Sequence, residues 1–172
     1  MDMSVPEPVR HTAARAAAAA IAAARSAGGV QVLCFSAAGS TYAMGIAAIK
    51  EIIEYGTLTT IPLMPAFIRG VINLRGAVLP IMDLAGRLGL PMAEPTVRHV
   101  IIVVKAGDRI MGMMVDAVSD ILAATPDMIQ ETPDLACEEV KGFLNGIVTL
   151  DGRMISEIAL ERLLPGRDQI AA

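Results

Sequence analysis

The residues whose spacing could support acid–base chemistry are Asp116 and Asp120, which flank Ser119. Two such carboxylates share a face of an extended segment, where one could act as a general acid and the other as a general base. The sequence offers no third group to tune either carboxyl for that role, and carboxylates near the end of a strand more commonly form a solvated edge. We therefore expect no catalytic residue and no enzyme activity.

Histidine and cysteine could ligate a metal, but the chain holds two of each, far apart. His11 lies in an alanine-rich N-terminal segment, and His99 stands alone at the edge of an expected strand, where a histidine is more often structural. Cys34 and Cys137 have apolar neighbours, which favours a reducing compartment over a disulfide scaffold. No glycine-rich phosphate loop occurs, so a kinase or ATPase is excluded. We expect no metal site and no cofactor.

The composition is that of a globular protein with a large core, since 54% of its 172 residues are hydrophobic. The longest uncharged stretch, Ser26 to Ile49, is interrupted by glycine and polar residues, so we expect no membrane insertion. The net charge of −4 and the aromatic content of 3% argue against a small β-barrel module that binds nucleic acid or another ligand, which is the less favoured alternative. We expect a cytoplasmic protein.

The composition divides the chain into three parts. Residues 1–29 contain an Ala/Arg tract with helical propensity but no apolar stripe, which predicts a flexible N-terminal tail. Residues 30–165 carry the folded domain, and residues 166–172 form a C-terminal tail.

From residue 30 onward, short runs rich in Val, Ile, Leu and Met are separated by Gly, Asp and Pro turns, which is typical of antiparallel β structure. Helical pieces are expected to be few and short. The predicted strands are Val30–Ser36, Thr41–Ile46, Gly70–Leu74, Ala77–Met82, Val100–Lys105, Arg109–Val115, Phe143–Leu150 and Gly152–Ile158.

An internal repeat indicates the architecture of this domain. Residues 31–35 align with 100–104, and residues 42–53 align with 111–122 at the same offset of 69. The second copy then contains seven more residues, after which the segment beginning at Gly70 aligns with the one beginning at Gly146. The chain therefore consists of two copies of one β unit.

Each copy contains a dipeptide ending in glycine between two apolar runs, Arg75-Gly76 or Asp151-Gly152, as in a two-residue β-hairpin. A unit of this size with several short strands is more naturally a small barrel than an open sheet, because closure removes exposed edges. The repeat predicts two intertwined β-barrels, the first mainly 30–95 and the second mainly 96–165.

The segment from Ile61 to Leu84, IPLMPAFIRGVINLRGAVLPIMDL, resembles the hallmark of the CheW-like domain. Tyr42–Ile53 and Gly112–Leu122 resemble equivalent strands of the family's two barrels, and Gly146–Leu164 resembles its closing hairpin and final helix. The resemblance runs from about Val30 to Pro165. It implies two SH3-like five-stranded β-barrels, in agreement with the repeat, and a stand-alone coupling protein of bacterial chemotaxis.

In this family the domain is a non-catalytic adaptor that ties a CheA-type histidine kinase to chemoreceptors. The resemblance implies contacts with the regulatory domain of the kinase and with the cytoplasmic tip of the receptor, within membrane-associated receptor arrays. A paralogue in a pilus, gliding or developmental pathway is the alternative. The positions that the resemblance marks as partner-contacting or coupling-sensitive are Ile49, Glu51, Gly70 and Arg75 in the first barrel, and Val100 and Val118 in the second.

Arg75 is the sharpest candidate, because an arginine at a hairpin tip can reach a carboxylate or carbonyl groups of a partner. The alternative for Arg75 is an ordinary solvated turn residue. We expect Gly70 to serve the backbone first, since Gly146 repeats it. The chain departs from the family in its alanine-rich N-terminal segment and in Ser156 and Glu157, which interrupt a usually apolar strand. We expect that strand to be irregular or partly exposed.

Overall fold

The protein is described by a computed structural model. The structure describes residues 19–21, 31–56, 58–92, 94, 96, 98–123, 128–131, 141–150 and 152–165. His11, Cys137, Asp151 and the predicted C-terminal tail lie outside these ranges, as does the predicted N-terminal tail apart from residues 19–21. Within the described part of the chain, no helix has the length and apolar character needed to cross a membrane.

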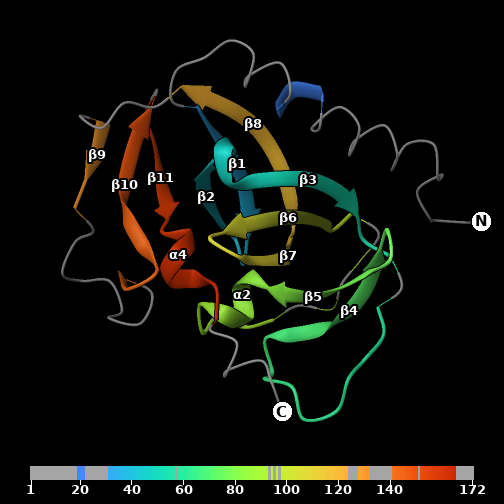
Figure 1. Ribbon diagram of the computed structural model, residues 1–172. Coiled ribbons are helices and arrows are strands. Elements are labelled where there is room, and N and C mark those ends of the chain that lie inside the picture. Colours follow the sequence, from blue (N-terminus) through green and yellow to red (C-terminus); the bar gives the residue numbers. More distant parts are fainter. Residues whose placement is uncertain are drawn as a thin grey trace, which may run out of the picture.

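The described chain is mainly β-strand with short helical pieces, as the sequence predicts (Figure 1). The first sequence copy supplies β1 (Gln31–Ala37), β2 (Ser40–Gly45), the 3₁₀ turn η1 (Ile46–Ala48), β3 (Ile49–Glu54), β4 (Ile68–Leu74), β5 (Ala77–Asp83) and α2 (Leu84–Arg87). The second copy supplies β6 (Val100–Ala106), β7 (Arg109–Val115), β8 (Ala117–Ala123), β9 (Ile129–Gln130), β10 (Leu144–Leu150), β11 (Arg153–Ile158) and α4 (Leu160–Leu163).

The strands form two sheets with the same plan, and each sheet takes strands from both sequence copies. One sheet has the order β8-β1-β2-β11-β10-β9, and the other has the order β3-β6-β7-β5-β4. Equivalent strands exchange places between the sheets, so that β1 and β2 stand in one sheet where β6 and β7 stand in the other. The parallel pairs β2–β11 and β5–β7 each join one copy to the other. The predicted division after residue 95 therefore separates the two sequence copies. It does not separate the two sheets, because each sheet contains strands from both copies.

Strands β1 and β6 are buried on both faces. On β1, Leu33 and Phe35 face a central cluster, whereas Val32 and Cys34 face a second cluster on the other side of the strand. The residues of β6 divide in the same way between the central cluster and a third cluster. Side chains alternate along a strand, so burial on both faces explains why these strands read as continuous apolar runs.

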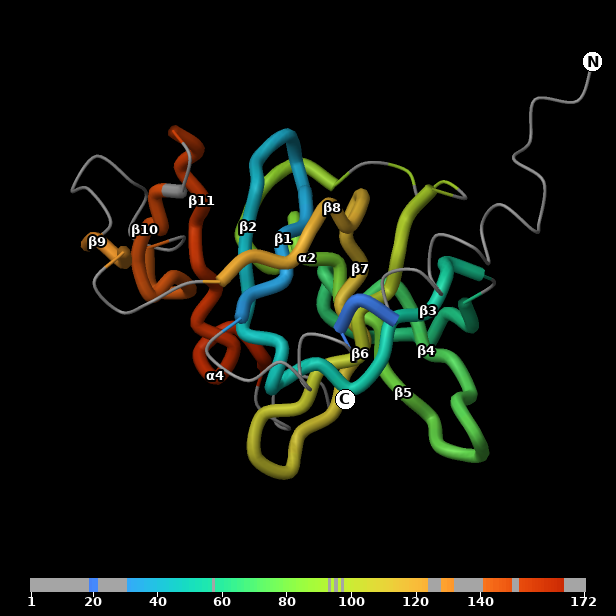
Figure 2. The backbone as a smooth tube through the Cα atoms, turned by 90° about the horizontal axis from the view of Figure 1, so that it is seen from above, coloured from blue at the N-terminus to red at the C-terminus, as the bar shows by residue number. Residues whose placement is uncertain are grey.

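The central cluster joins the two sheets. Figure 2 shows the backbone of both sheets from above. Its buried members are Ile21, Leu33, Phe35, Ala37, Tyr42, Met44, Ile46, Ile49, Ile52, Ile68, Met82, Leu84, Leu88, Ile102, Val104, Ala106, Met111, Met113, Val115, Leu144, Ile158, Leu160, Leu163 and Leu164. Because both sheets and both short helices contribute to it, this cluster makes the described body a single packing unit.

Arg87 joins the equivalent helices α2 and α4. Its Nε donates a hydrogen bond of 2.7 Å to the carbonyl oxygen of Leu163. Its guanidinium lies over the rings of Phe67 and Phe143, at 4.9 and 4.8 Å from the ring centroids. Burial lowers the pKa of Arg87, and the two aromatic faces and the carbonyl offset part of the hydration that the cation loses.

Strand β11 stays in register through Ser156 and Glu157, which pair with β2. Both residues are half-buried, in agreement with the expected partial exposure. The irregularity lies on the neighbouring strand, because the register of β10 against β11 shifts between Leu144 and Gly146. The same shift occurs in β4 between Ile68 and Gly70, so the bulge belongs to the repeated unit and the two polar residues do not break β11.

The exchange of strands leads to a prediction about the two sequence copies. We expect residues 30–95 and residues 96–165, expressed separately, to lack a cooperative thermal unfolding transition, because neither copy contains a complete sheet. Circular dichroism melting and the dispersion of amide NMR signals measure this. Residues 30–165 expressed as one chain are the control, and a well-dispersed spectrum from either copy alone would contradict the prediction.

Candidate partner-binding surface

Arg75 and Glu51, two of the predicted site residues, form a bidentate ion pair. Arg75 Nη1 lies 2.6 Å from Glu51 Oε1, and Arg75 Nη2 lies 3.0 Å from Glu51 Oε2. The hydrogen bonds that Arg75 donates to Glu51 raise the pKa of Arg75 above its ordinary value. The Arg75 side chain is nevertheless 75% exposed, against 24% for Glu51. The pair therefore holds an exposed guanidinium in a defined position, as a docking residue requires.

The ion pair connects the two edges of its sheet. Glu51 lies on β3 at one edge, and Arg75 lies in the turn between β5 and the opposite edge strand β4. Arg75 and Gly76 have φ angles of 52° and 87°, as in the turn of a tight two-residue hairpin. The side-chain oxygen of Asn73 accepts a hydrogen bond of 2.9 Å from the Gly76 N–H. The predicted hairpin is therefore present, and its conformation directs Arg75 toward β3.

The other predicted apolar site residues belong to the core or lie around it. Ile49 is only 1% exposed and is a member of the central cluster, so its side chain is not available for direct contact with a partner. Val100 and Val118 are half-buried and pack against the same cluster. The three residues share one packing environment, through which a change at one can reach the others.

Gly70 and its repeat equivalent Gly146 each lie against a backbone carbonyl. A Cβ atom at Gly70 would lie 2.7 Å from the carbonyl oxygen of Thr59, and one at Gly146 would clash with that of Gln130. Both glycines lie at register shifts, one in β4 and the other in β10. This geometry agrees with a structural role for Gly70, because an added side chain would displace the neighbouring segment.

A second ion pair, which the sequence reasoning missed, occupies the equivalent place in the other sheet. Arg153 Nη1 lies 3.4 Å from Asp120 Oδ2. Asp120 is the repeat equivalent of Glu51, and Arg153 follows the hairpin turn that is equivalent to the turn containing Arg75. The repeat offset of 69 relates Glu51 to Asp120 and could have identified the acidic partner. It could not identify Arg153, which lies two residues beyond the position that aligns with Arg75.

The two hairpins also expose equivalent apolar residues. Val78 of β5 is 67% exposed and Met154 of β11 is 65% exposed, and each lies three residues after the first residue of its turn. Large apolar side chains with this exposure are candidates for contact with other proteins when they lie beside fixed charges. Both hairpin tips therefore combine an ion pair with an exposed apolar side chain.

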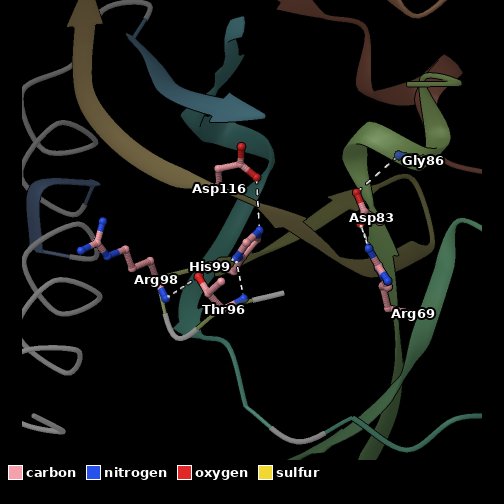
Figure 3. A network of polar contacts seen from close by, with 7 residues as sticks. All are labelled: Arg69, Asp83, Gly86, Thr96, Arg98, His99 and Asp116. Carbon is pink, nitrogen blue, oxygen red and sulfur yellow. Dashed lines mark hydrogen bonds and ion pairs between the residues drawn. The ribbon is translucent and has the colours of Figure 1, made fainter. Parts of the chain in front are cut away.

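His99 lies in a polar network, in agreement with the structural role expected from the sequence (Figure 3). Its Nδ1 accepts a hydrogen bond of 2.9 Å from the Thr96 N–H, and its Nε2 lies 3.2 Å from Asp116 Oδ1. The backbone N–H of Asp116 donates to the carbonyl oxygen of Ser36 at 2.9 Å. The network holds the point at which the chain leaves one sheet for the other.

The structure separates Asp116 from Asp120, the two carboxylates considered for acid–base chemistry. Asp116 lies at the bend before β8 and contacts His99, whereas Asp120 lies within β8 and contacts Arg153. A register shift opposite Ser119 interrupts the alternation of side chains between them, so the expectation of a shared face does not hold. Among the described residues, no three His, Cys, Asp or Glu side chains gather as a metal site would require.

Asp83, which the sequence reasoning also missed, is a buried carboxylate with two partners (Figure 3). Arg69 Nη2 lies 2.8 Å from its Oδ2, and the Gly86 N–H donates a hydrogen bond of 3.3 Å to its Oδ1. Asp83 is the N-cap of α2, so it fixes the start of that helix at the end of β5. Its position directly before the Leu84–Leu88 segment, as a typical N-cap residue, is the signal that could have identified it.

A groove of about 760 Å³ separates η1, the β6–β7 turn and α4. Its polar lining residues are Lys105, Asn145, Glu157, Glu161 and Arg162, and glycine, alanine and larger apolar residues line the rest. None of the six predicted site residues lines it. The candidate surface is therefore the region of the first ion pair, and the groove is a separate feature.

Comparison with known proteins places this geometry in context. The family model described as the CheW-like domain matches residues 31–167. The chain is 44% identical to the chemotaxis protein CheW of Rhizobium meliloti over 145 residues, which covers 84% of this chain and 94% of that protein. It is 30% identical to the chemotaxis protein CheW of Bacillus subtilis over 136 residues, which covers 79% and 87% of the two chains.

A solved structure and a more distant relative agree with these matches. The crystal structure of the scaffolding protein TtCheW from Thermoanaerobacter tengcongensis superposes with a TM-score of 0.74 at 29% identity, covering 84% of this chain and 93% of that chain. Protein PilI of Pseudomonas aeruginosa is 26% identical over 113 residues, which covers 66% of this chain and 64% of that protein.

The close approach at Gly70 predicts a loss of stability on substitution. We expect Gly70→Ala to lower the free energy of unfolding by about 1–3 kcal/mol, because the added Cβ displaces the Thr59 carbonyl. Denaturant unfolding measures the change. Gly56→Ala is the matched control, since no atom lies within 4 Å of a Cβ at that position. Equal effects of the two substitutions would refute the explanation.

Burial of Cys34 predicts a dependence of stability on alkaline pH. Desolvation, assisted by the charge of Asp120, raises the pKa of the Cys34 thiol to about 11. An unfolded thiol ionises at about pH 8.5, so the stability due to protonated Cys34 is complete below that pH and is lost as the pH rises toward 11. We expect Cys34→Ala to lose less unfolding free energy than the wild type between pH 8 and pH 11. Cys137→Ala is the control, and parallel losses in all three proteins would contradict the assignment.

Proposed function

The chain belongs to the CheW-like domain family, and we propose that it is the chemotaxis adaptor that couples chemoreceptors to a CheA-type histidine kinase through protein–protein contacts. The observation that carries the proposal is the match to a chemotaxis protein CheW at 44% identity over 94% of that protein's length. The similarity to a solved scaffolding protein supports the same role. In such a protein, function consists of holding partners in a fixed relation.

The use of polar side chains in this chain supports an adaptor. Asp83 is buried against Arg69, and His99 lies between Thr96 and Asp116. These contacts fix strand ends and corners of the fold, which is a structural use of groups that an enzyme would aim at a substrate. Among the four ion pairs described above, the Arg75 side chain is the most exposed to solvent, and it lies at a hairpin tip.

We place one partner contact at the surface formed by Arg75, Glu51 and Val78. An exposed guanidinium held by a carboxylate can offer its remaining N–H groups to a partner without the entropic cost of ordering a free side chain. Val78 supplies apolar area close to this charge. The partners are the regulatory domain of the kinase and the cytoplasmic tip of the receptor, and the adaptor works in the cytoplasm at membrane-associated receptor arrays.

A related adaptor role in a pilus pathway is the second candidate. It is favoured by the similarity to PilI, which covers 66% of this chain at 26% identity. The 44% identity to a chemotaxis protein CheW favours chemotaxis over this alternative. Deletion of the gene followed by separate assays of swimming chemotaxis and surface motility distinguishes the two, because each candidate requires a defect in a different assay.

The first ion pair predicts a change in kinase binding. We expect Arg75→Glu to weaken binding to the regulatory domain of the cognate kinase about tenfold or more, because it removes the guanidinium and places a second carboxylate beside Glu51. Isothermal titration calorimetry measures the affinity. The Glu51→Arg/Arg75→Glu double variant separates two explanations, since it restores the ion pair but not the arginine at the tip.

Arg153→Glu, which disrupts the second ion pair, is the matched control for charge reversal. If the double variant recovers binding, the pair acts by fixing the hairpin. If it does not recover, Arg75 itself contacts the kinase. Equal binding by wild type and Arg75→Glu would remove Arg75 from the kinase surface, and absence of binding by the wild type would refute the proposed coupling role.

A further inference from the structure

The alanine-rich segment at the N-terminus makes a specific contact with the folded body. Residues 19–21 form a helical turn in which Ala19 and Ala20 are exposed. Ile21 is only 4% exposed and belongs to the central cluster. In the run from Ala16 to Ala24, Ile21 is the one residue larger than alanine. A single isoleucine in an otherwise featureless run is therefore the side chain that anchors this turn.

The contact lies close to residues of the candidate site. Figures 1 and 2 show residues 19–21 on the side of the molecule where β8 and β3 lie. Ile49, at the start of β3, belongs to the same cluster as Ile21, and Val118 and Ile121 of β8 pack against that cluster. Ile21 thus belongs to the same cluster as Ile49, one of the positions where the family resemblance places coupling.

The chemistry of this contact suits a reversible attachment. Alanine forms helix at almost no cost in side-chain entropy, so the turn is inexpensive to order. One buried isoleucine gives a modest hydrophobic gain, which has to offset the ordering of the backbone around it. A partner that buries more apolar surface at this place would therefore have only a modest hydrophobic contact to displace.

We propose that the turn at residues 19–21 is an internal competitor, which occupies the surface near β8 and β3 through Ile21 and is displaced when a partner binds there. A helical turn that inserts an aliphatic side chain occupies this surface in the free protein, so the partner that fits is one that presents an aliphatic side chain from a helix. The helical cytoplasmic tip of a chemoreceptor is such a partner. The choice of this partner rests on the proposed adaptor function, whereas the docking of Ile21 does not.

Limited trypsin digestion of the full-length protein tests the docking by itself. Arg15 and Arg25 flank Ile21, so docking should slow cleavage at these two sites. We expect Ile21→Asp and Ile21→Ala to accelerate cleavage there at least several-fold, while the rest of the domain stays resistant. Ala20→Asp is the matched control, because it adds the same charge at an adjacent exposed position. Equal cleavage of Ile21→Asp, Ile21→Ala and Ala20→Asp would overturn the docking.

Affinity for a cytoplasmic fragment of the cognate chemoreceptor tests the competition. We expect Ile21→Asp and Ile21→Ala to bind several-fold more tightly than wild type, and Ala20→Asp to bind like wild type. Faster cleavage without tighter binding would overturn the competition. If neither wild type nor any variant binds the receptor fragment or the kinase regulatory domain, the proposed function fails while the digestion still reports on Ile21. The conservative Ile21→Ala variant keeps the test valid if Ile21→Asp perturbs folding.

Discussion

The structure depends on the burial of β1 and β6 on both faces. Each of these strands faces the central cluster with one set of side chains and a cluster of its own sheet with the other. Such strands need neighbours on every side, and here those neighbours come from both sequence copies. The exchange of strands, the two parallel junctions and the joined helices α2 and α4 follow from this need. A rigid body with no separable half is the kind of scaffold on which partner surfaces can keep a fixed relation.

The two sequence copies share an ion pair between an edge strand and a hairpin, but the arginine occupies a different position in each copy. Glu51 and Asp120 occupy equivalent positions on the edge strands β3 and β8, and each binds an arginine from the hairpin on the far side of its sheet. In the first copy the arginine is in the turn itself, and in the second it begins β11. The equivalent connection between an edge strand and a hairpin therefore presents different side chains in the two sheets. Equivalent positions in the two sheets therefore differ in charge and reach, and differences of this kind are what distinguish partners at protein interfaces.

The sequence predicted the fold class and most strands because apolar runs separated by turn residues report β structure directly. The bounds of β7 are those predicted, and the other predicted strands differ from the observed ones by one or two residues at an end. β3 and β8 were not predicted because Lys50 and Ser119, equivalent in the repeat, lie at register shifts that break the alternation. β9 has two residues and leaves no pattern. Pairing between the copies was not predictable, since alignment shows equivalence and not which strands lie side by side.

For the candidate site, the motif positions identified Glu51 and Arg75 separately, but their contact depends on how β3 faces the β4–β5 hairpin. Ile49 was chosen in the same way and is buried, because a matched position carries no information on exposure. The buried carboxylate of Asp83 is paired within the body, with Arg69. The exposed charged and apolar side chains that other proteins could contact lie mainly at the hairpin tips and along the edge strands. An adaptor binds its partners through surface residues of this kind. Its packed interior keeps the binding surfaces at a constant distance from one another.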